Sequence, residues 1–101
     1  MFHNQARTFI EKVIQTRKRL MRSGKSKISP AWATARIKTI ERYLSYPGYS
    51  KDVDFAMFWK RNRSLVLELM TGGDSDSTNA LRQEFQQIDM QHSIIIAESC
   101  R

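Results

Sequence analysis

Cysteine is almost absent from this sequence, which limits the chemistry that the chain can perform. Its 101 residues include a single cysteine, Cys100, so no disulfide can form within the chain and no cluster of cysteines can hold a metal ion. A chain with one cysteine suits a reducing compartment. We therefore expect a cytoplasmic protein with no metal site and no cofactor.

Long apolar runs are also missing. The apolar stretches extend over only a few residues, whereas a membrane-spanning helix needs about 20. The first residues, MFHNQARTFIEK, lack the continuous apolar segment of a secretory signal. We expect a soluble protein without a membrane partner.

Groups that usually carry catalysis are few and poorly placed. The only histidines are His3, which we place in a mobile terminus, and His92, which falls on the apolar line of a helix. The segments GYSKD and TGGDS match neither the P-loop nor the dinucleotide-binding glycine pattern. The sequence therefore favours a protein that is not an enzyme and has no small-molecule substrate.

Only two prolines and four glycines are present, and they divide the chain into four segments. Gly24 suits a helix C-terminus because glycine accepts the left-handed backbone, and Ser29 followed by Pro30 is typical of a helix start. Pro47-Gly48 and Gly72-Gly73 mark two further turns. The expected helices span residues 4–23, 30–45, 51–71 and 78–98.

Within each segment the apolar residues recur every three or four positions, as in an amphipathic helix. In the first segment Arg17 falls on this apolar stripe, and either Ser50 or Asp52 is expected to cap the third helix. No alternating strand pattern occurs outside the run Ile94–Ile96. Residues 1–101 are therefore predicted to form a single all-α domain, a compact bundle of about four helices.

Acidic residues are scarce in the N-terminal half, although the net charge of the whole chain is +7. Residues 1–50 hold eleven Lys or Arg against Glu11 and Glu41, while residues 51–101 hold six against eight acids. The stretch TRKRLMRSGKSK, residues 16–27, contains six basic residues and no acid. One or two cations suit a helix C-terminus, but this number exceeds what the helix dipole accounts for.

Such a concentration of positive charge is typical of proteins that bind the phosphate backbone of nucleic acids. We therefore predict a small DNA- or RNA-binding protein without base-specific contacts. A merely solvated basic face and an acidic protein partner remain alternatives. A helix-turn-helix fits only loosely, because SGKSKIS is longer than its usual turn. The candidate binding residues are Arg17, Lys18, Arg19, Arg22, Lys25, Lys27, Arg36, Lys38 and Arg42.

The alternative function is a protein-interaction adaptor or inhibitor. Compact, basic chains of this size without catalytic motifs are also typical of phage or plasmid regulators and of antagonists of a larger host assembly. Such a protein would dock through exposed apolar residues, which would also serve a homodimer. The candidate partner or oligomer interface comprises Met57, Leu67, His92, Ile94, Ile95 and Ile96.

Overall fold

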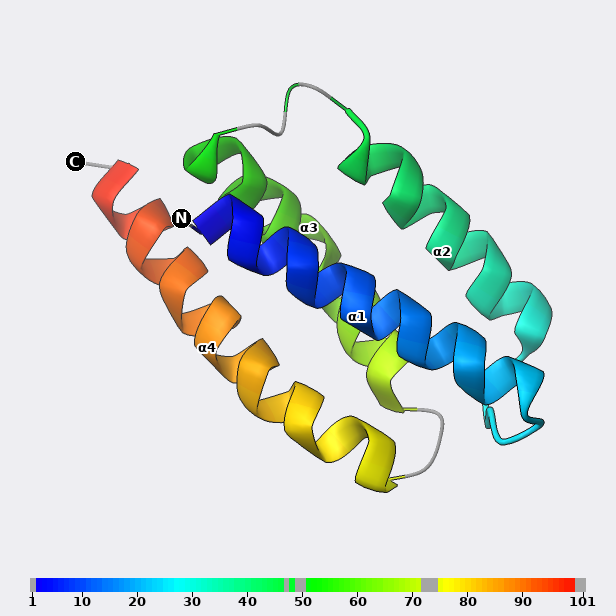
Figure 1. Cartoon of the computed structure of the whole chain (residues 1–101). Coiled ribbons are helices and arrows are strands. Elements are labelled where there is room, and N and C mark those ends of the chain that lie inside the picture. The colour runs from blue at the N-terminus through cyan, green and yellow to red at the C-terminus, as the bar shows by residue number, and fades with distance from the viewer. Residues whose placement is uncertain (1, 47, 49–50, 72–74, 100–101) are drawn as a thin grey trace.

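The computed structural model describes residues 2–46, 48, 51–71 and 75–99, and the predicted all-α bundle is confirmed (Figure 1). The helices are α1 (Phe2–Arg22), α2 (Pro30–Leu44), α3 (Asp52–Thr71) and α4 (Ser75–Ser99). Two predicted starts were too late, because α1 begins two residues and α4 three residues earlier than expected. The predicted Gly72-Gly73 turn lies outside the described residues.

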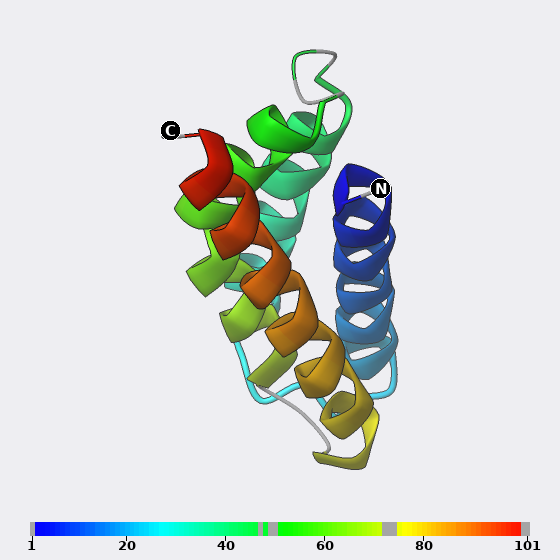
Figure 2. The same cartoon turned by 90° about the vertical axis from the view of Figure 1, so that its left-hand side faces the viewer.

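Three helices surround the main core, and the fourth covers one side of it. α1, α3 and α4 pack against one another, whereas α2 lies along α1 on the side away from α4 (Figures 1 and 2). Phe9 of α1, Trp59 of α3 and Phe85 of α4 meet in the core, with ring centroids 5.2–6.3 Å apart. These buried rings join the three helices, and aromatic contacts of this kind stabilise beyond the apolar area that they bury.

The C-terminal end of α1 and the N-terminal end of α2 form as the sequence predicts. Gly24 has φ +76°, and the amides of Gly24 and Lys25 donate to the carbonyls of Met21 and Leu20 at 3.2 and 2.9 Å. This is the Schellman arrangement, which satisfies carbonyls at a helix C-terminus and favours glycine. Ser29 Oγ accepts a hydrogen bond from the amide of Trp32 at 3.4 Å, directly before the helix that Pro30 begins.

His3 belongs to a helix, so its placement in a mobile terminus was wrong. The backbone amide of His3 donates to Asp52 Oδ1 at 2.9 Å, and His3 Nδ1 lies 2.5 Å from the same oxygen. Asp52, expected as a cap for its own helix, thus accepts an N–H from the first turn of α1, where anions are stabilised. The hydrogen bond from the His3 amide lowers the pKa of Asp52, and the His3 side chain reinforces this effect.

A second carboxylate joins α3 to α4. Asp89 accepts hydrogen bonds from Arg63 Nε and Nη2 at 2.6 and 2.7 Å and from the indole of buried Trp59 at 3.0 Å. Burial by itself would raise the pKa of Asp89, but the hydrogen bonds from Arg63 and Trp59 outweigh it and hold that pKa below its ordinary value.

Because the pKa values of Asp52 and Asp89 are lowered in the folded protein, we expect the fold to lose stability in acid. A carboxyl group whose pKa is lower in the folded than in the unfolded chain stabilises the fold fully above about pH 4. This contribution disappears as the pH falls through the lowered pKa values of Asp52 and Asp89. We expect the free energy of unfolding, measured in urea, to decrease steadily below about pH 4. Asp89→Asn should weaken this pH dependence, and an unchanged profile in that variant would contradict the assignment.

Candidate polyanion-binding surface

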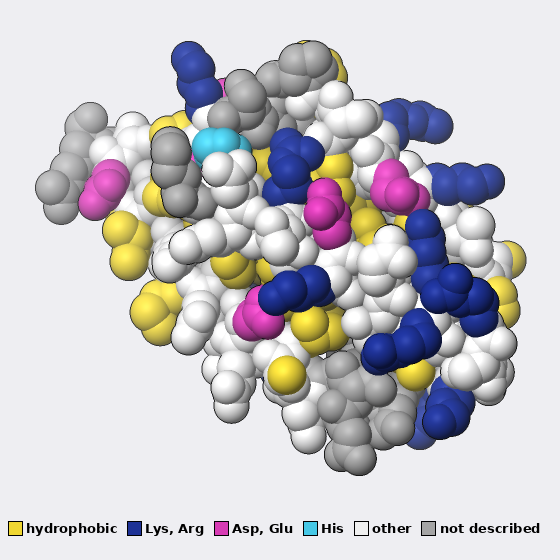
Figure 3. Space-filling model, in the orientation of Figure 1, with side chains coloured by type: hydrophobic (Ala, Val, Ile, Leu, Met, Phe, Trp, Pro, Cys, Tyr) yellow, Lys and Arg dark blue, Asp and Glu magenta, His cyan; other side chains and the backbone are white. Residues whose placement is uncertain are grey.

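More than half of the described Lys and Arg residues lie around the C-terminal end of α1, the 23–29 loop and α2, and Figure 3 shows a cluster of them on one side of the molecule. Residues 16–46 contain nine basic residues and one acid, Glu41. Eight of the nine are exposed or half-buried, and together we call them the basic surface. Its members are Lys18, Arg19, Arg22, Lys25, Lys27, Arg36, Lys38 and Arg42.

Helix periodicity places these cations on neighbouring outer faces. Arg19 and Arg22 are three residues apart and exposed on α1, and Lys38 and Arg42 are four residues apart and exposed on α2. The chain reversal at Gly24 sets α2 beside α1, with the loop lysines at the joining end (Figure 1). The basic surface therefore extends across two helices and their connection instead of along one helix.

The one acid within this region neutralises little of its charge. Lys18 Nζ lies 3.8 Å from Glu41 Oε2, and both side chains are more than a third exposed. Exposed ion pairs of this length contribute little, because water and salt screen them. The pair links α1 to α2 and leaves the surrounding cations to face solvent.

Arg17 does not belong to this surface, so its prediction as a nucleic-acid-binding residue was wrong. Its side chain is 0% exposed, and Nε and Nη2 donate to the carbonyl of Leu69 at 2.9 and 2.5 Å. Burial lowers the pKa of the guanidinium. Arg17 therefore acts inside the fold, where it satisfies a carbonyl near the C-terminal end of α3.

The buried guanidinium also holds the loop that carries two lysines of the basic surface. Arg17 Nη1 donates to Ser26 Oγ at 3.1 Å, and Ser26 Oγ donates in turn to the carbonyl of Ile28 at 3.2 Å. Ser26 lies between Lys25 and Lys27, both of which are exposed. Arg17 is thus a positioning residue for the loop.

The aromatic residues near the surface differ in their exposure. Trp32 is half-buried against the core, and the Arg36 guanidinium lies over its ring, 5.3 Å from the centroid. This contact occupies an aromatic face that a nucleic-acid base would need for stacking. Tyr46, by contrast, is exposed just beyond the end of α2.

The predicted partner interface is only partly on the surface. Met57, Leu67 and Ile94 are exposed, while Ile95 and Ile96 are half-buried against the core. His92 was wrong as an interface residue: it is only 8% exposed, and its Nδ1 lies 2.6 Å from the carbonyl oxygen of Asp89. Met90, which was not predicted as an interface residue, is the most exposed large apolar residue among those described, at 66%.

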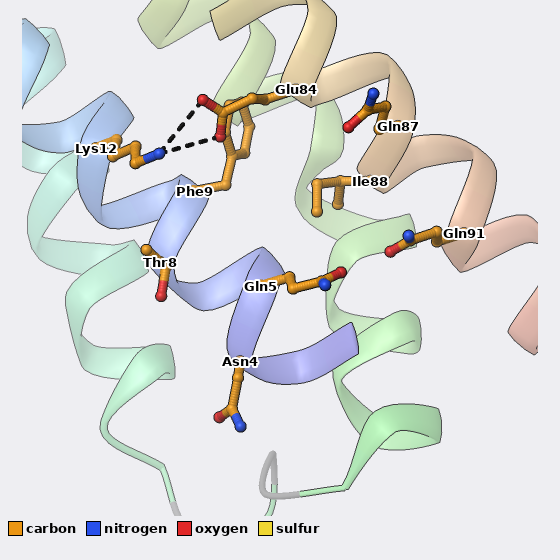
Figure 4. A pocket seen from close by; sticks show the side chains of 9 residues that line it. All are labelled: Asn4, Gln5, Thr8, Phe9, Lys12, Glu84, Gln87, Ile88 and Gln91. Carbon is orange, nitrogen blue, oxygen red and sulfur yellow. Dashed lines mark hydrogen bonds and ion pairs between the residues drawn. The ribbon is translucent and has the colours of Figure 1, made fainter. Parts of the chain in front are cut away.

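A hollow of about 400 Å³ lies between α1 and α4 (Figure 4). Amide side chains from both helices line it, including Gln5 and Gln91, and Lys12 Nζ pairs with Glu84 across it at 3.3 Å. Because Glu84 offsets the charge of Lys12, this hollow offers hydrogen-bonding groups but no excess of positive charge.

The described residues contain no group of three or more His, Cys, Asp or Glu side chains placed to hold a metal ion. In the same part of the chain, every helix is too short or too polar to cross a bilayer.

Comparison with known proteins found no matching family model, no matching curated protein and no matching solved structure.

Proposed function

We propose that this chain is a small non-enzymatic protein that binds nucleic acid by holding the phosphate backbone on its basic surface. The observation that carries the proposal is the set of eight exposed or half-buried cations around a single acid. Removing Arg17 from the candidate residues leaves this imbalance in place, because Arg17 contributes no exposed charge.

The positions of the cations favour a role in ligand binding, because stabilisation of helix ends accounts for only some of them. Arg19 and Arg22 lie in the last turn of α1, where the helix dipole favours positive charge. That explanation does not extend to Lys38 within α2 or to Lys25 and Lys27 in the loop. These cations repel one another in the free protein, and a polyanion would relieve that repulsion.

The proposed binding mode is contact with phosphates instead of bases. Lys and Arg on the sides of two helices fit a charged backbone, and phosphate contacts carry no direct sequence information. Arg36, a side chain able to contact bases, lies over Trp32. The basic surface therefore favours binding to nucleic acid with little dependence on sequence.

The direct test is fluorescence anisotropy of the whole protein with labelled duplex DNA and single-stranded RNA of equal length. If about five phosphates are neutralised, the slope of log affinity against log salt should be near −4.5 for the duplex and near −3.5 for the single strand. Duplex affinity should then fall about 500-fold between roughly 50 and 200 mM salt. Absence of binding to both probes at low salt would overturn the proposal.

An adaptor or inhibitor is the second candidate, supported by the exposure of Met57, Leu67 and Ile94. Exposed apolar side chains of this size favour binding when a partner protein covers them and removes them from water. In that function the basic surface would meet acidic side chains of a protein. This candidate would be favoured if neither nucleic-acid probe binds.

A further inference from the structure

In α4, none of the exposed residues from Gln83 to Ala97 carries a charge, which is unusual for a helix that faces water. Its exposed residues include Gln83, Gln87, Met90, Ile94 and Ala97, which follow one another at alternating spacings of four and three. This spacing keeps them on one side of the helix over about four turns. The face is amide-rich in its first half and apolar in its second half.

Glu84, Asp89 and Arg82 lie on the flanks of this strip, and exposed Glu98 follows its last residue. Glu84 pairs with Lys12 of α1 at 3.3 Å, and Asp89 pairs with Arg63 of α3. Arg82 lines the hollow between α3 and α4 together with Arg63 and Asp89. The uncharged strip between these flanks contains the two most exposed large apolar residues described in α4, Met90 at 66% and Ile94 at 53%.

We infer that this strip, the α4 face, binds the α4 face of a second copy of the chain. In a two-fold symmetric contact each residue meets the same patch on its partner, so charges of one sign would repel one another. An uncharged strip avoids this repulsion. Its amide and apolar side chains can also pack against the same strip on a second copy. A strongly acidic or basic partner would find no complementary charge on it.

The distribution of charge over the whole molecule also favours a second copy at this position. Two chains with a net charge of +7 each repel one another wherever their cations approach. The basic surface lies around α2 and the end of α1, on the side of the bundle away from α4 (Figures 1 and 3). Contact through α4 therefore keeps the two basic surfaces far apart.

The shape of the face supplies a place for partner side chains. A hollow of about 310 Å³ beside Ile94 is lined by Phe2 and Gln5 of α1 and by Gln91 and Ile95 of α4. A methionine or isoleucine from the second copy can enter it, which extends the contact beyond one helix. Since α4 has 25 residues, it is about 37 Å long. A strip about 10 Å wide along it buries about 370 Å² on each copy, or about 740 Å² in total, which is less than the ~1,200 Å² of stable complexes and fits a weak, transient contact. We therefore expect a dissociation constant in the micromolar range, whether or not the basic surface binds nucleic acid.

Sedimentation equilibrium of the whole chain tests this inference. At about 100 μM, wild-type protein should sediment with twice the 11.8 kDa monomer mass. The variant Met90→Lys/Ile94→Lys should associate at least ~100-fold more weakly, because it places like charges across the contact. Gln83→Lys/Gln87→Lys tests the same face at polar positions, should the first variant fail to fold.

Met57→Lys is the matched control, since it adds the same charge at an exposed methionine on α3. It should leave the dimer intact. A wild-type monomer at about 100 μM would overturn the inference. So would a dimer that survives the α4 substitutions or dissociates with Met57→Lys.

Discussion

Arg17→Ala should lower the free energy of unfolding by about 3 kcal/mol, a loss comparable to that from truncating a buried apolar side chain. The change removes two hydrogen bonds from a charged group to the buried carbonyl of Leu69 and one to Ser26. It also leaves a cavity where a fully buried side chain stood. Relief of the desolvation of the guanidinium offsets part of this cost.

Urea denaturation of two further variants separates these contributions. Arg17→Met retains most of the buried volume, so its loss should be smaller, about 1–2 kcal/mol, and should reflect the hydrogen bonds. Arg19→Ala changes an exposed arginine two residues away and should alter stability by less than about 0.5 kcal/mol. If Arg17→Ala and Arg19→Ala cost the same, Arg17 does not have the structural role assigned to it.

Arg19→Glu/Arg22→Glu should weaken nucleic-acid binding at least ~100-fold near 50 mM salt, while the protein remains folded. Both side chains are exposed on the last part of α1, so their reversal removes two phosphate contacts and adds repulsion without disturbing the core. The slope of log affinity against log salt should also become less steep by about 1.8 for duplex DNA. Anisotropy titrations of the variant and of wild-type protein measure both quantities.

Lys60→Glu/Arg61→Glu provides the matched control. It changes the net charge by the same amount, at exposed residues of α3 outside the basic surface. Long-range electrostatics alone should reduce affinity only a few-fold there, because salt screens charges beyond about 10 Å. Equal losses in the two double variants would mean that binding follows total charge and has no defined surface.

Much of the fold follows from signals that lie close together in the sequence. Gly24, Ser29 and Pro30 act within one turn of their own position, and the helix ends there agree with the expectation. The start of α4 was placed three residues too late because the segment DSDST offers several residues that favour helix starts. Local preference alone does not choose among them.

The functions of Arg17 and His3 depend on partners that are distant in the sequence. The period of the first helix placed Arg17 on the apolar stripe, but its dense basic surroundings suggested a surface residue. The Arg17 side chain is held inside the fold by its hydrogen bond to the carbonyl of Leu69, which is 52 residues away in the sequence. In the same way, the partner of His3 is Asp52, 49 residues away. No local pattern identifies either contact.

The charge of the candidate site was predictable from the sequence, because it depends on the numbers of basic and acidic residues in each half of the chain. The shortage of acids in the first half predicted a concentration of positive charge, and the structure leaves eight of the nine candidate binding residues exposed or half-buried. Their assembly across α1 and α2 requires the chain reversal at Gly24. His92 was placed at an interface because spacing alone does not distinguish the core side of a helix from a second apolar face, and its burial settles the matter.

The most direct test of the central claim is an amide NMR titration of labelled wild-type protein with a short DNA duplex at low salt. The account predicts that chemical-shift changes concentrate in residues 18–42, at the end of α1, in the 23–29 loop and along α2. They should diminish as salt is added, because the contacts are with phosphates. Changes that concentrate on α4, or no changes at all, would contradict the claim that the basic surface holds the nucleic acid.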